Sequence, residues 1–383
     1  MPMRRFSVVL GALVLAAART ASAQTPITAS IGDATFTLYG DVDLYLNYMH
    51  SSSGADILAI QDGAILRSRI GARGELKLGG DDFKAKFSLE QGVNATSGAF
   101  ADATRMFDRQ LWIGLVTPAG EIRVGRQNTT VFYRGDNIDY CGRTLCSVVN
   151  AFGIPARYDT DIAYISPRMA GVQLEGHYSL QGSIVDHPAE QRVYQVSVDY
   201  EKGPFRVGYL RVAGKPASGT PIQDEVTYDN FFANYNYGAG KAYLVYIRSN
   251  NNGPTDVLLN GSTPLGGTGA LVTGMDAGAE TTYNIFEASA DYVVVPDLRV
   301  GALVGTIRDS DSGTDKNATG GSAGAFYVIK NITLYAFAEL LDNDRNAGFR
   351  PIGSAGLTKP FTAPEDVNGR TIVGAQTGLV YRF

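Results

Sequence analysis

Basic side chains share one face of a segment in the first quarter of the chain. One face carries Arg67, Arg69, Arg73 and Lys77. The other carries Leu66, Ile70, Leu76 and Leu78. In an extended strand, alternate side chains point to opposite faces, so this spacing predicts a strand with one apolar and one basic side. A row of cations can attract anions, but it needs water, because unpaired charges are costly in an apolar core.

Residue types for covalent or metal chemistry are sparse. The three histidines are His50, His177 and His187, and His177 shares a strand face with Glu175. The sequence contains no nucleophile elbow, metalloprotease signature or phosphate-binding loop. We therefore expect no enzyme, no catalytic residue, no cofactor and no metal. An outer-membrane hydrolase built from Ser, His and Asn on neighbouring strands is the remote alternative, because it would leave no local motif.

An acidic stretch at residues 309–315 has the oxygen spacing of a calcium-binding loop. It lacks the downstream glutamate that would bind calcium with both oxygens, and it lacks flanking helices. An acidic surface loop is the preferred interpretation.

The composition favours a β-rich protein. The 383 residues include 45 Gly and 21 Tyr, and only 19 % are charged. No run of 18 apolar residues occurs, which excludes a helical membrane protein. Apolar residues, at 44 %, are too many for a disordered chain and must be dispersed by alternation.

The first 23 residues have the pattern of a signal peptide. Arg4 and Arg5 precede an apolar stretch, and a small-residue site ends at Ala23, so cleavage is expected before Gln24. Loss of the leader takes the 33 basic residues to 30, against 38 acidic ones, a net charge of −8. Nucleic-acid binding is disfavoured, because no basic field covers the chain.

Strict alternation identifies the kind of β-protein. In the last strand one face carries Val373, Ala375, Thr377, Leu379, Tyr381 and Phe383. The two aromatic residues at the strand end are typical of the aromatic girdle of a membrane barrel. Similar segments place charges in mid-strand on the other face, which a water-filled lumen tolerates and a dry core does not.

Strand counting predicts a pore. Short turns such as 79–81 and 202–204 alternate with long polar connections such as 92–105 and 249–281. Sixteen strands are expected: 34–49, 65–78, 82–91, 106–117, 121–127, 157–166, 171–180, 191–201, 204–212, 226–237, 241–248, 282–294, 298–308, 321–330, 332–341 and 369–383. The fold class is therefore all-β, a transmembrane antiparallel barrel with short periplasmic turns and long extracellular loops. A barrel of this size encloses water.

The chain resembles Gram-negative general diffusion porins of the β-proteobacterial type. The similar pieces are 38–43, 68–76, 108–115, 124–127, 157–167 and the terminal Tyr381-Arg382-Phe383. The resemblance implies one porin domain over residues 24–383, a homotrimer, and a third loop (128–156) folded into the lumen as a constriction. It also implies that Arg69, Arg126 and Arg157 form the basic wall of that constriction. Arg73 is a further candidate, because alternation places it on the same strand face as Arg69.

The third loop supplies the expected acidic and redox residues. Asp136 and Asp139 are the candidate acidic partners of the basic wall. Cys141 and Cys146 are the only cysteines, and an exported chain passes an oxidising compartment, so a disulfide is expected to stiffen the loop tip. Two free thiols are the alternative.

These features predict an outer-membrane channel for passive diffusion of small hydrophilic solutes and ions, mildly anion-preferring. Its other expected partners are outer-membrane lipid and lipopolysaccharide. A substrate-specific channel for a sugar or an organic anion is the alternative, with Tyr39, Tyr45, Tyr133 and Tyr140 as candidates for a binding surface in the lumen.

Overall fold

The computed structural model describes residues 26–134, 138–180, 192–214, 225–251, 265, 268–269 and 281–383. The leader, the predicted cleavage site, Asp136, His187 and most of the 249–281 connection lie outside these ranges. Within them, no helix is both long and apolar enough to cross a membrane.

Strands dominate the described chain. The strands up to the third loop are β1 (Ile27–Ile31), β2 (Ala34–Ser51), β3 (Asp56–Asp62), β4 (Arg69–Gly79), β5 (Phe83–Gly92), β6 (Gln110–Thr117) and β7 (Gly120–Asn128). The third loop contains α1 (Thr130–Arg134), α2 (Val148–Phe152) and β8 (Gly153–Ile154). The next strands are β9 (Arg157–Ile165), β10 (Val172–Ser179), β11 (Val193–Lys202), β12 (Phe205–Gly214), β13 (Val226–Asn236) and β14 (Lys241–Ser249). The remaining elements are β15 (Thr268–Gly269), β16 (Tyr283–Val295), β17 (Leu298–Asp309), β18 (Ala318–Ile329), β19 (Ile332–Asn343), the 3-10 helix η2 (Pro364–Asp366) and β20 (Thr371–Arg382).

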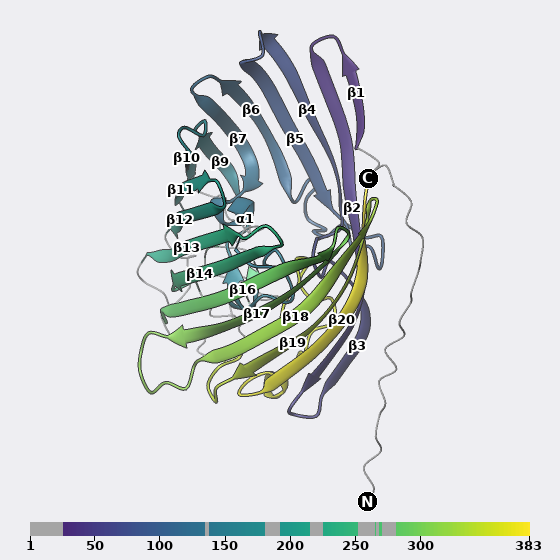
Figure 1. Cartoon of the computed structure of the whole chain (residues 1–383), viewed down its shortest axis with the longest axis vertical. Coiled ribbons are helices and arrows are strands. Elements are labelled where there is room, and N and C mark those ends of the chain that lie inside the picture. The colour runs from purple at the N-terminus through teal and green to yellow at the C-terminus, as the bar shows by residue number, and fades with distance from the viewer. Residues whose placement is uncertain are drawn as a thin grey trace, which may run out of the picture.

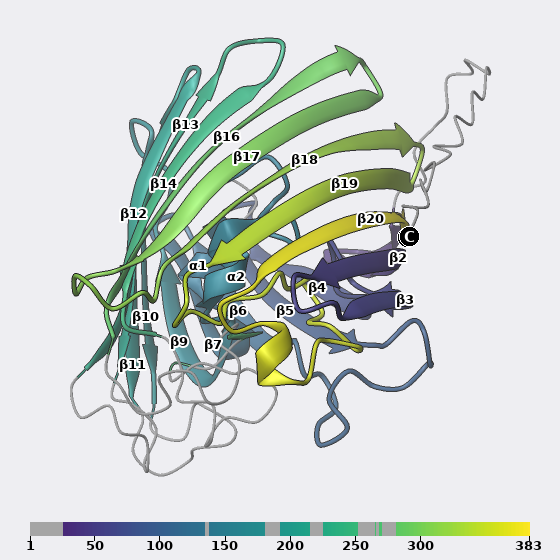
Figure 2. The ribbon, with the colours of Figure 1, turned by 90° about the horizontal axis from the view of Figure 1, so that it is seen from below.

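The strands form a closed antiparallel barrel of sixteen positions, which confirms the predicted fold class (Figures 1 and 2). From β4 onward, each strand of the barrel pairs with the next barrel strand along the chain, and β20 pairs with β2 to close the sheet. The short strands β8 and β15 form a separate pair. Two positions hold two strands each. On one side of β2, β3 pairs with its second half and β4 with its first half. On the other side, β20 pairs with residues 41–51 and β1 with residues 34–38. Closure leaves no long sheet edge unpaired, as a membrane-spanning sheet requires.

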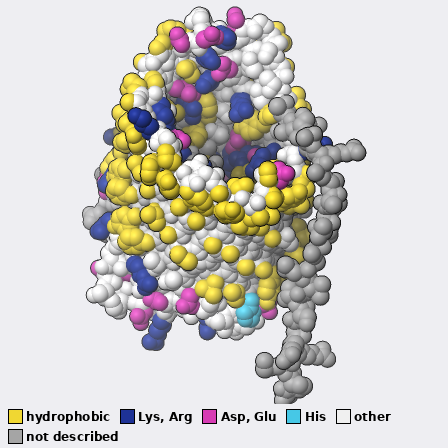
Figure 3. Space-filling view, viewed as in Figure 1, with side chains coloured by type: hydrophobic (Ala, Val, Ile, Leu, Met, Phe, Trp, Pro, Cys, Tyr) yellow, Lys and Arg dark blue, Asp and Glu magenta, His cyan; other side chains and the backbone are white. Residues whose placement is uncertain are grey.

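Side chains alternate along the strands between an exposed outer wall and a buried inner wall, as the sequence predicts. In β20, Val373, Ala375, Thr377 and Leu379 are exposed outward, whereas the residues that alternate with them are buried or half-buried toward the inside. Ile113 on β6 and Leu244 on β14 are likewise exposed on the outer wall. Figure 3 shows charged side chains gathered in the hollow of the barrel and a largely hydrophobic surface outside.

The structure corrects the prediction for the second strand. The sequence predicts strands at 34–49 and 65–78 with none between them, but β3 occupies 56–62 and β4 begins only at Arg69. The six residues between them, 63–68, leave the sheet and are called the inner segment here. Asp43 on β2 holds this segment, because its Oδ2 accepts hydrogen bonds from the backbone N–H groups of Ile65 and Leu66, both at 2.8 Å.

Short turns join the strands at one rim, and long connections lie at the other. Gly80 and Gly203 have φ of +68° and +61° in two of the short turns, a conformation that costs glycine little. The third long connection turns into the barrel and carries both α-helices (Figure 2). This loop and the inner segment position the site.

Candidate functional site

The third loop, residues 128–156, lies along the inner wall and is called the inward loop. Its middle part is anchored by Tyr140, which is buried against β17 and β18. The backbone N–H of Tyr140 donates to Ser289 Oγ at 3.1 Å, and its carbonyl accepts from Arg299 Nη1 at 2.7 Å. A Cβ built on Gly301 would lie 2.2 Å from the Tyr140 ring. Glycine at position 301 is therefore what lets the loop approach the sheet.

The first helix of the loop is held by ion pairs with the wall. Arg134 at the end of α1 contacts Glu175 on β10 at 2.8 Å and Asp199 on β11 at 3.3 Å. His177 lies between Glu175 and Asp161, with ring nitrogens 2.8 and 2.7 Å from their carboxylates. All these groups are largely buried, so the network fixes the position of α1.

The tip of the loop is closed covalently. Cys141 and Cys146 form a disulfide, which encloses six residues including Arg143. Within the ring, the backbone N–H of Leu145 donates to the carbonyl of Ala64 in the inner segment at 3.3 Å. The bore is therefore narrowed by two inward structures that touch each other.

Between these structures and the wall of β4 to β9 lies a cavity of about 660 Å³, called the arginine cavity. Its basic lining residues are Arg67, Arg69, Arg126, Arg143 and Arg157. Its acidic lining residues are Asp102 and Asp108. Arg69, Arg126 and Arg157, which the family resemblance groups together, thus line one cavity in the structure.

Arg126 reaches the lumen through a local irregularity. Strict alternation with the outward residues Ile122 and Val124 would point it at lipid. Instead the register of β7 against β9 shifts between Gly125 and Gln127, and Gly125 has φ of +132°. Such a bulge re-aims the following side chain. Arg126 then donates to Asp159 Oδ1 at 2.7 Å and to the carbonyl of Asp108 at 2.6 Å.

Phe132 on α1 organises the remaining guanidinium groups. Its ring centre lies 4.5 Å from the guanidinium carbon of Arg157, 5.3 Å from that of Arg143 and 5.9 Å from that of Arg109. The negative face of an aromatic ring attracts cations. Within the described residues, Nε and Nη2 of Arg157 are buried and have no hydrogen-bond partner, so the charge of this guanidinium is not paired by a direct contact at these atoms.

Of the two acidic residues that the sequence proposed for the site, the structure describes only Asp139. Asp136 lies outside the described residues. Asp139 does not face the arginines: it is 1 % exposed, and its Oδ1 accepts from the backbone N–H groups of Cys141 and Arg143. Carboxylates on the wall pair the arginines instead, with Asp41 2.8 Å from Arg69 and Glu90 2.5 Å from Arg109.

Arg73 lies in a second cavity, of about 510 Å³, on the side of the short turns. Sequence reasoning missed this cavity, the inner segment and the roles of Phe132, Arg109 and Asp159. Arg109 belongs to the 108–115 piece of the family resemblance, which was its only local signal. Asp159 likewise belongs to the 157–167 piece, but its pairing with Arg126 depends on the bulge at Gly125. Phe132 had no local signal, because its place depends on the path of the inward loop.

A sixteen-position barrel with an apolar outer wall, a charged inner wall and a narrowed bore defines a pore-forming membrane barrel. A model of the Gram-negative porin family matches residues 10–346, and the chain belongs to that family. This confirms the resemblance seen in the sequence and places the protein in the bacterial outer membrane.

Relatives agree with this assignment. The chain is 30 % identical over 245 residues to an outer membrane porin protein of Bordetella pertussis, covering 60 % of each chain. It is 28 % identical over 183 residues to the major outer membrane protein P.IB of Neisseria meningitidis, covering 46 % of this chain and 53 % of the relative. The chain thus spans little more than half the length of these curated relatives.

Solved structures share the fold. An anion-selective porin from Comamonas acidovorans superposes with a TM-score of 0.71 at 20 % identity, covering 91 % of this chain and all of the other. The outer-membrane protein OmpT of Vibrio cholerae superposes with a TM-score of 0.64 at 16 % identity, covering 93 % of this chain and all of the other.

Proposed function

We propose that this protein forms a water-filled channel for passive diffusion of small hydrophilic solutes and ions, with a mild preference for anions. The observation that carries the proposal is the lining of the arginine cavity, with five guanidinium groups against two carboxylates. Rings of fixed charge in a narrow pore bias which ions pass. The negative net charge of the chain is carried largely elsewhere, and salt screens charges farther than about 8 Å.

Facing charges also shape which solutes pass. Arg157 and Arg143 flank Phe132, while Asp159 and Asp108 lie beside Arg126. Opposed charges across a narrow opening create a transverse field that orients dipolar solutes. Passage of zwitterions and polar nutrients of small size fits this arrangement.

Planar bilayers test the ion preference. A salt gradient across the refolded protein should give a reversal potential that favours chloride over potassium, and Arg157→Gln should reduce it. Lys241→Gln, at an exposed position on the short-turn rim, is the matched control and should leave it unchanged. Clear cation preference of the unsubstituted protein at neutral pH would refute the proposal.

The assembly proposal is a homotrimer in which each barrel conducts. The trimeric form in which OmpT of Vibrio cholerae was solved supports it by fold likeness. Three equal conductance steps per insertion would support both pore and trimer, whereas single independent steps would contradict the trimer. We also propose that residues 1–23 are removed, so that the mature N-terminus is Gln24, which mass spectrometry of the membrane protein checks.

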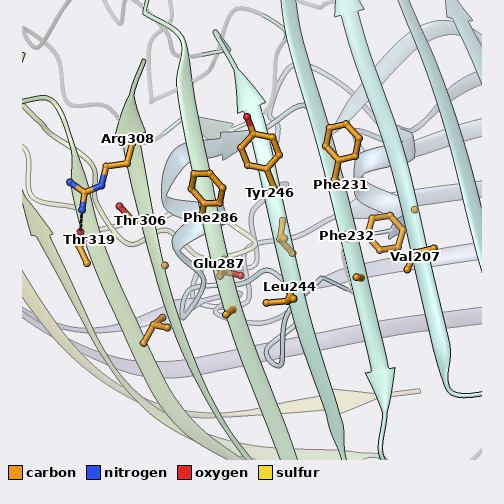
Figure 4. A pocket seen from close by; sticks show the side chains of 16 residues that line it. Val207, Phe231, Phe232, Leu244, Tyr246, Phe286, Glu287, Thr306, Arg308 and Thr319 are labelled. Carbon is orange, nitrogen blue, oxygen red and sulfur yellow. Dashed lines mark hydrogen bonds between the residues drawn. The ribbon is translucent and has the colours of Figure 1, made fainter. Parts of the chain in front are cut away.

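Contact with lipopolysaccharide is proposed for the outer rim. Figure 4 shows Phe231, Tyr246 and Phe286 on neighbouring strands of the outer wall, and their ring centres are 6.0 and 4.8 Å apart. Aromatic rows mark the membrane interface. Toward the long loops from this row lie Arg248 and Arg308, and such exposed cations suit lipid phosphate groups.

The family consists of channels, and we propose that this chain has no enzymatic activity. The charged groups around His177 support this, because they pair with one another and with Arg134 and so hold the inward loop in place. Ester hydrolysis by the purified protein would contradict the proposal.

A further inference from the structure

The second cavity combines aromatic rings and cations at the exit of the constriction. It lies toward the short turns and is called the aromatic cavity. The residues that matter are Tyr39 on β2, Arg73 on β4, Trp112 on β6, Arg123 on β7 and Tyr133 on α1. Tyr133 also lines the arginine cavity, so the two cavities are neighbours along the bore. Its volume of about 510 Å³ lies within the usual range of small-molecule sites.

The guanidinium group of Arg123 contacts two aromatic rings that form one wall of the cavity. The guanidinium carbon of Arg123 lies 4.5 Å from the ring centre of Trp112 and 5.5 Å from that of Tyr133. Arg123 also donates from Nη1 to the Tyr133 hydroxyl at 2.9 Å and from Nε to Glu121 at 2.7 Å. Burial raises the pKa of Tyr133 to about 12, so its phenol stays neutral. These contacts fix both rings in place and link the wall to the inward loop.

A second guanidinium group is left for a ligand. Arg73 is exposed in the cavity, with its guanidinium carbon 5.4 Å from the ring centre of Tyr39. Within the described residues Arg73 forms no ion pair. The nearby carboxylates are already engaged, since Glu75 pairs with Lys84 at 2.8 Å and Glu121 with Arg123. The cavity therefore carries an uncompensated positive charge beside aromatic surface.

From this geometry we propose that the aromatic cavity is a binding site for aromatic carboxylates that cross the channel. The carboxylate would pair with Arg73, because a guanidinium group binds a carboxylate through two parallel hydrogen bonds. The flat ring would lie against Trp112 and Tyr133, where aromatic contacts add to burial. The proposal deepens the proposed channel function and rests on it.

Trp112 is the only tryptophan of the chain and therefore reports on this cavity alone. The refolded full-length protein in detergent is titrated with benzoate while tryptophan emission is recorded. Saturable change of the emission is expected. Acetate, which has no ring, and benzyl alcohol, which has no charge, should give no saturable change. An equal response to either would overturn the proposal, because ring and carboxylate would then not be recognised together.

Variants assign the response to the site. Arg73→Gln should weaken the apparent benzoate affinity at least about tenfold, as expected for loss of a charge-assisted bidentate contact. Lys202→Gln, an exposed cation near the short-turn rim and outside the cavity, should leave it unchanged. Unchanged affinity in Arg73→Gln would overturn the proposal.

Bilayer recordings separate failure of this proposal from failure of the channel function. Benzoate added on the short-turn side should block current reversibly in the unsubstituted protein and in Trp112→Phe, and much less in Arg73→Gln. A protein that conducts potassium chloride but shows neither block nor fluorescence change overturns only the benzoate site. A folded protein that conducts nothing overturns the channel itself.

Discussion

Leu145 at the tip of the inward loop donates its backbone N–H to the carbonyl oxygen of Ala64 in the inner segment, at 3.3 Å. The contact joins two structures that enter the lumen from different strands. Leu145 belongs to the ring closed by Cys141 and Cys146, so the disulfide constrains this contact directly. The opening beside Arg143 is therefore bounded by a tip whose position depends on the disulfide, on the wall contacts of Tyr140 and on the anchor of α1.

Reduction of the disulfide is expected to loosen the constriction and spare the barrel. A bond that closes six residues restricts the open chain by about 2 kcal/mol in the chain-entropy model. Single-channel recordings with reductant should show altered conductance and more open-channel noise, while the thermal transition of the β-signal stays within a few degrees. A double variant, Cys141→Ser with Cys146→Ser, should behave like reduced protein and be insensitive to reductant. Identical traces with and without reductant would refute the prediction.

Rising pH is expected to weaken docking of the loop tip. Burial raises the pKa of Asp139, whose carboxyl group faces that of Glu287 on β16. Docked Asp139 therefore holds its proton more tightly than undocked Asp139, so docking is strongest below the usual carboxyl pKa and declines as pH rises above it. Val149 N–H and Ser147 Oγ, the other groups on Glu287, do not titrate in this range.

Open-channel noise recorded between pH 4 and 9 checks this dependence. Asp139→Asn keeps an oxygen for the N–H groups of Cys141 and Arg143 and carries no proton to lose. Its noise should vary with pH much less than that of the unsubstituted protein. An equal pH slope in both proteins would show that another group is responsible.

Gly301→Ala is expected to displace the inward loop. The added Cβ would lie 2.2 Å from the Tyr140 ring, and overpacking of this kind costs about 1–3 kcal/mol. Because the clash is with the loop, the barrel should assemble while conductance changes. Gly176→Ala is the matched control, since its nearest neighbour would be 3.9 Å from the added Cβ. Equal conductance of the two variants would mean that the loop does not need glycine at position 301.

Arg134→Met is expected to release α1 from the wall. The substitution leaves Glu175 and Asp199 without their shared loop cation, and removal of one member of a buried ion pair costs about 3–5 kcal/mol. Phe132 would move with the helix, so the guanidinium groups around it would spread and anion preference would fall. Reversal potentials and protease sensitivity of the loop measure this. Arg134→Lys, which keeps the charge, should recover part of the preference; if it behaves like Arg134→Met, packing rather than charge anchors the helix.

Alternation in the sequence determined the architecture. Ile70 and Arg69 had to face opposite sides of a strand, and apolar outer faces with charged inner faces require lipid outside and water inside. The strand count and the closed barrel follow from this local pattern together with short turns, which is why they could be predicted. The grouping of Arg69, Arg126 and Arg157 came from family resemblance, since they are distant in sequence.

The tertiary structure alone decided how the bore is filled. The bulge at Gly125 turns Arg126 inward, although strict alternation would place it on the outer face. Hydrogen bonds to Asp43 hold residues 63–68 outside the sheet. Wall contacts on β16 to β18 set the path of the inward loop and buried Asp139 away from the arginines. A strand's faces follow from a period of two residues, but a loop's path depends on which distant wall offers it space and hydrogen-bond partners, and no local spacing encodes that.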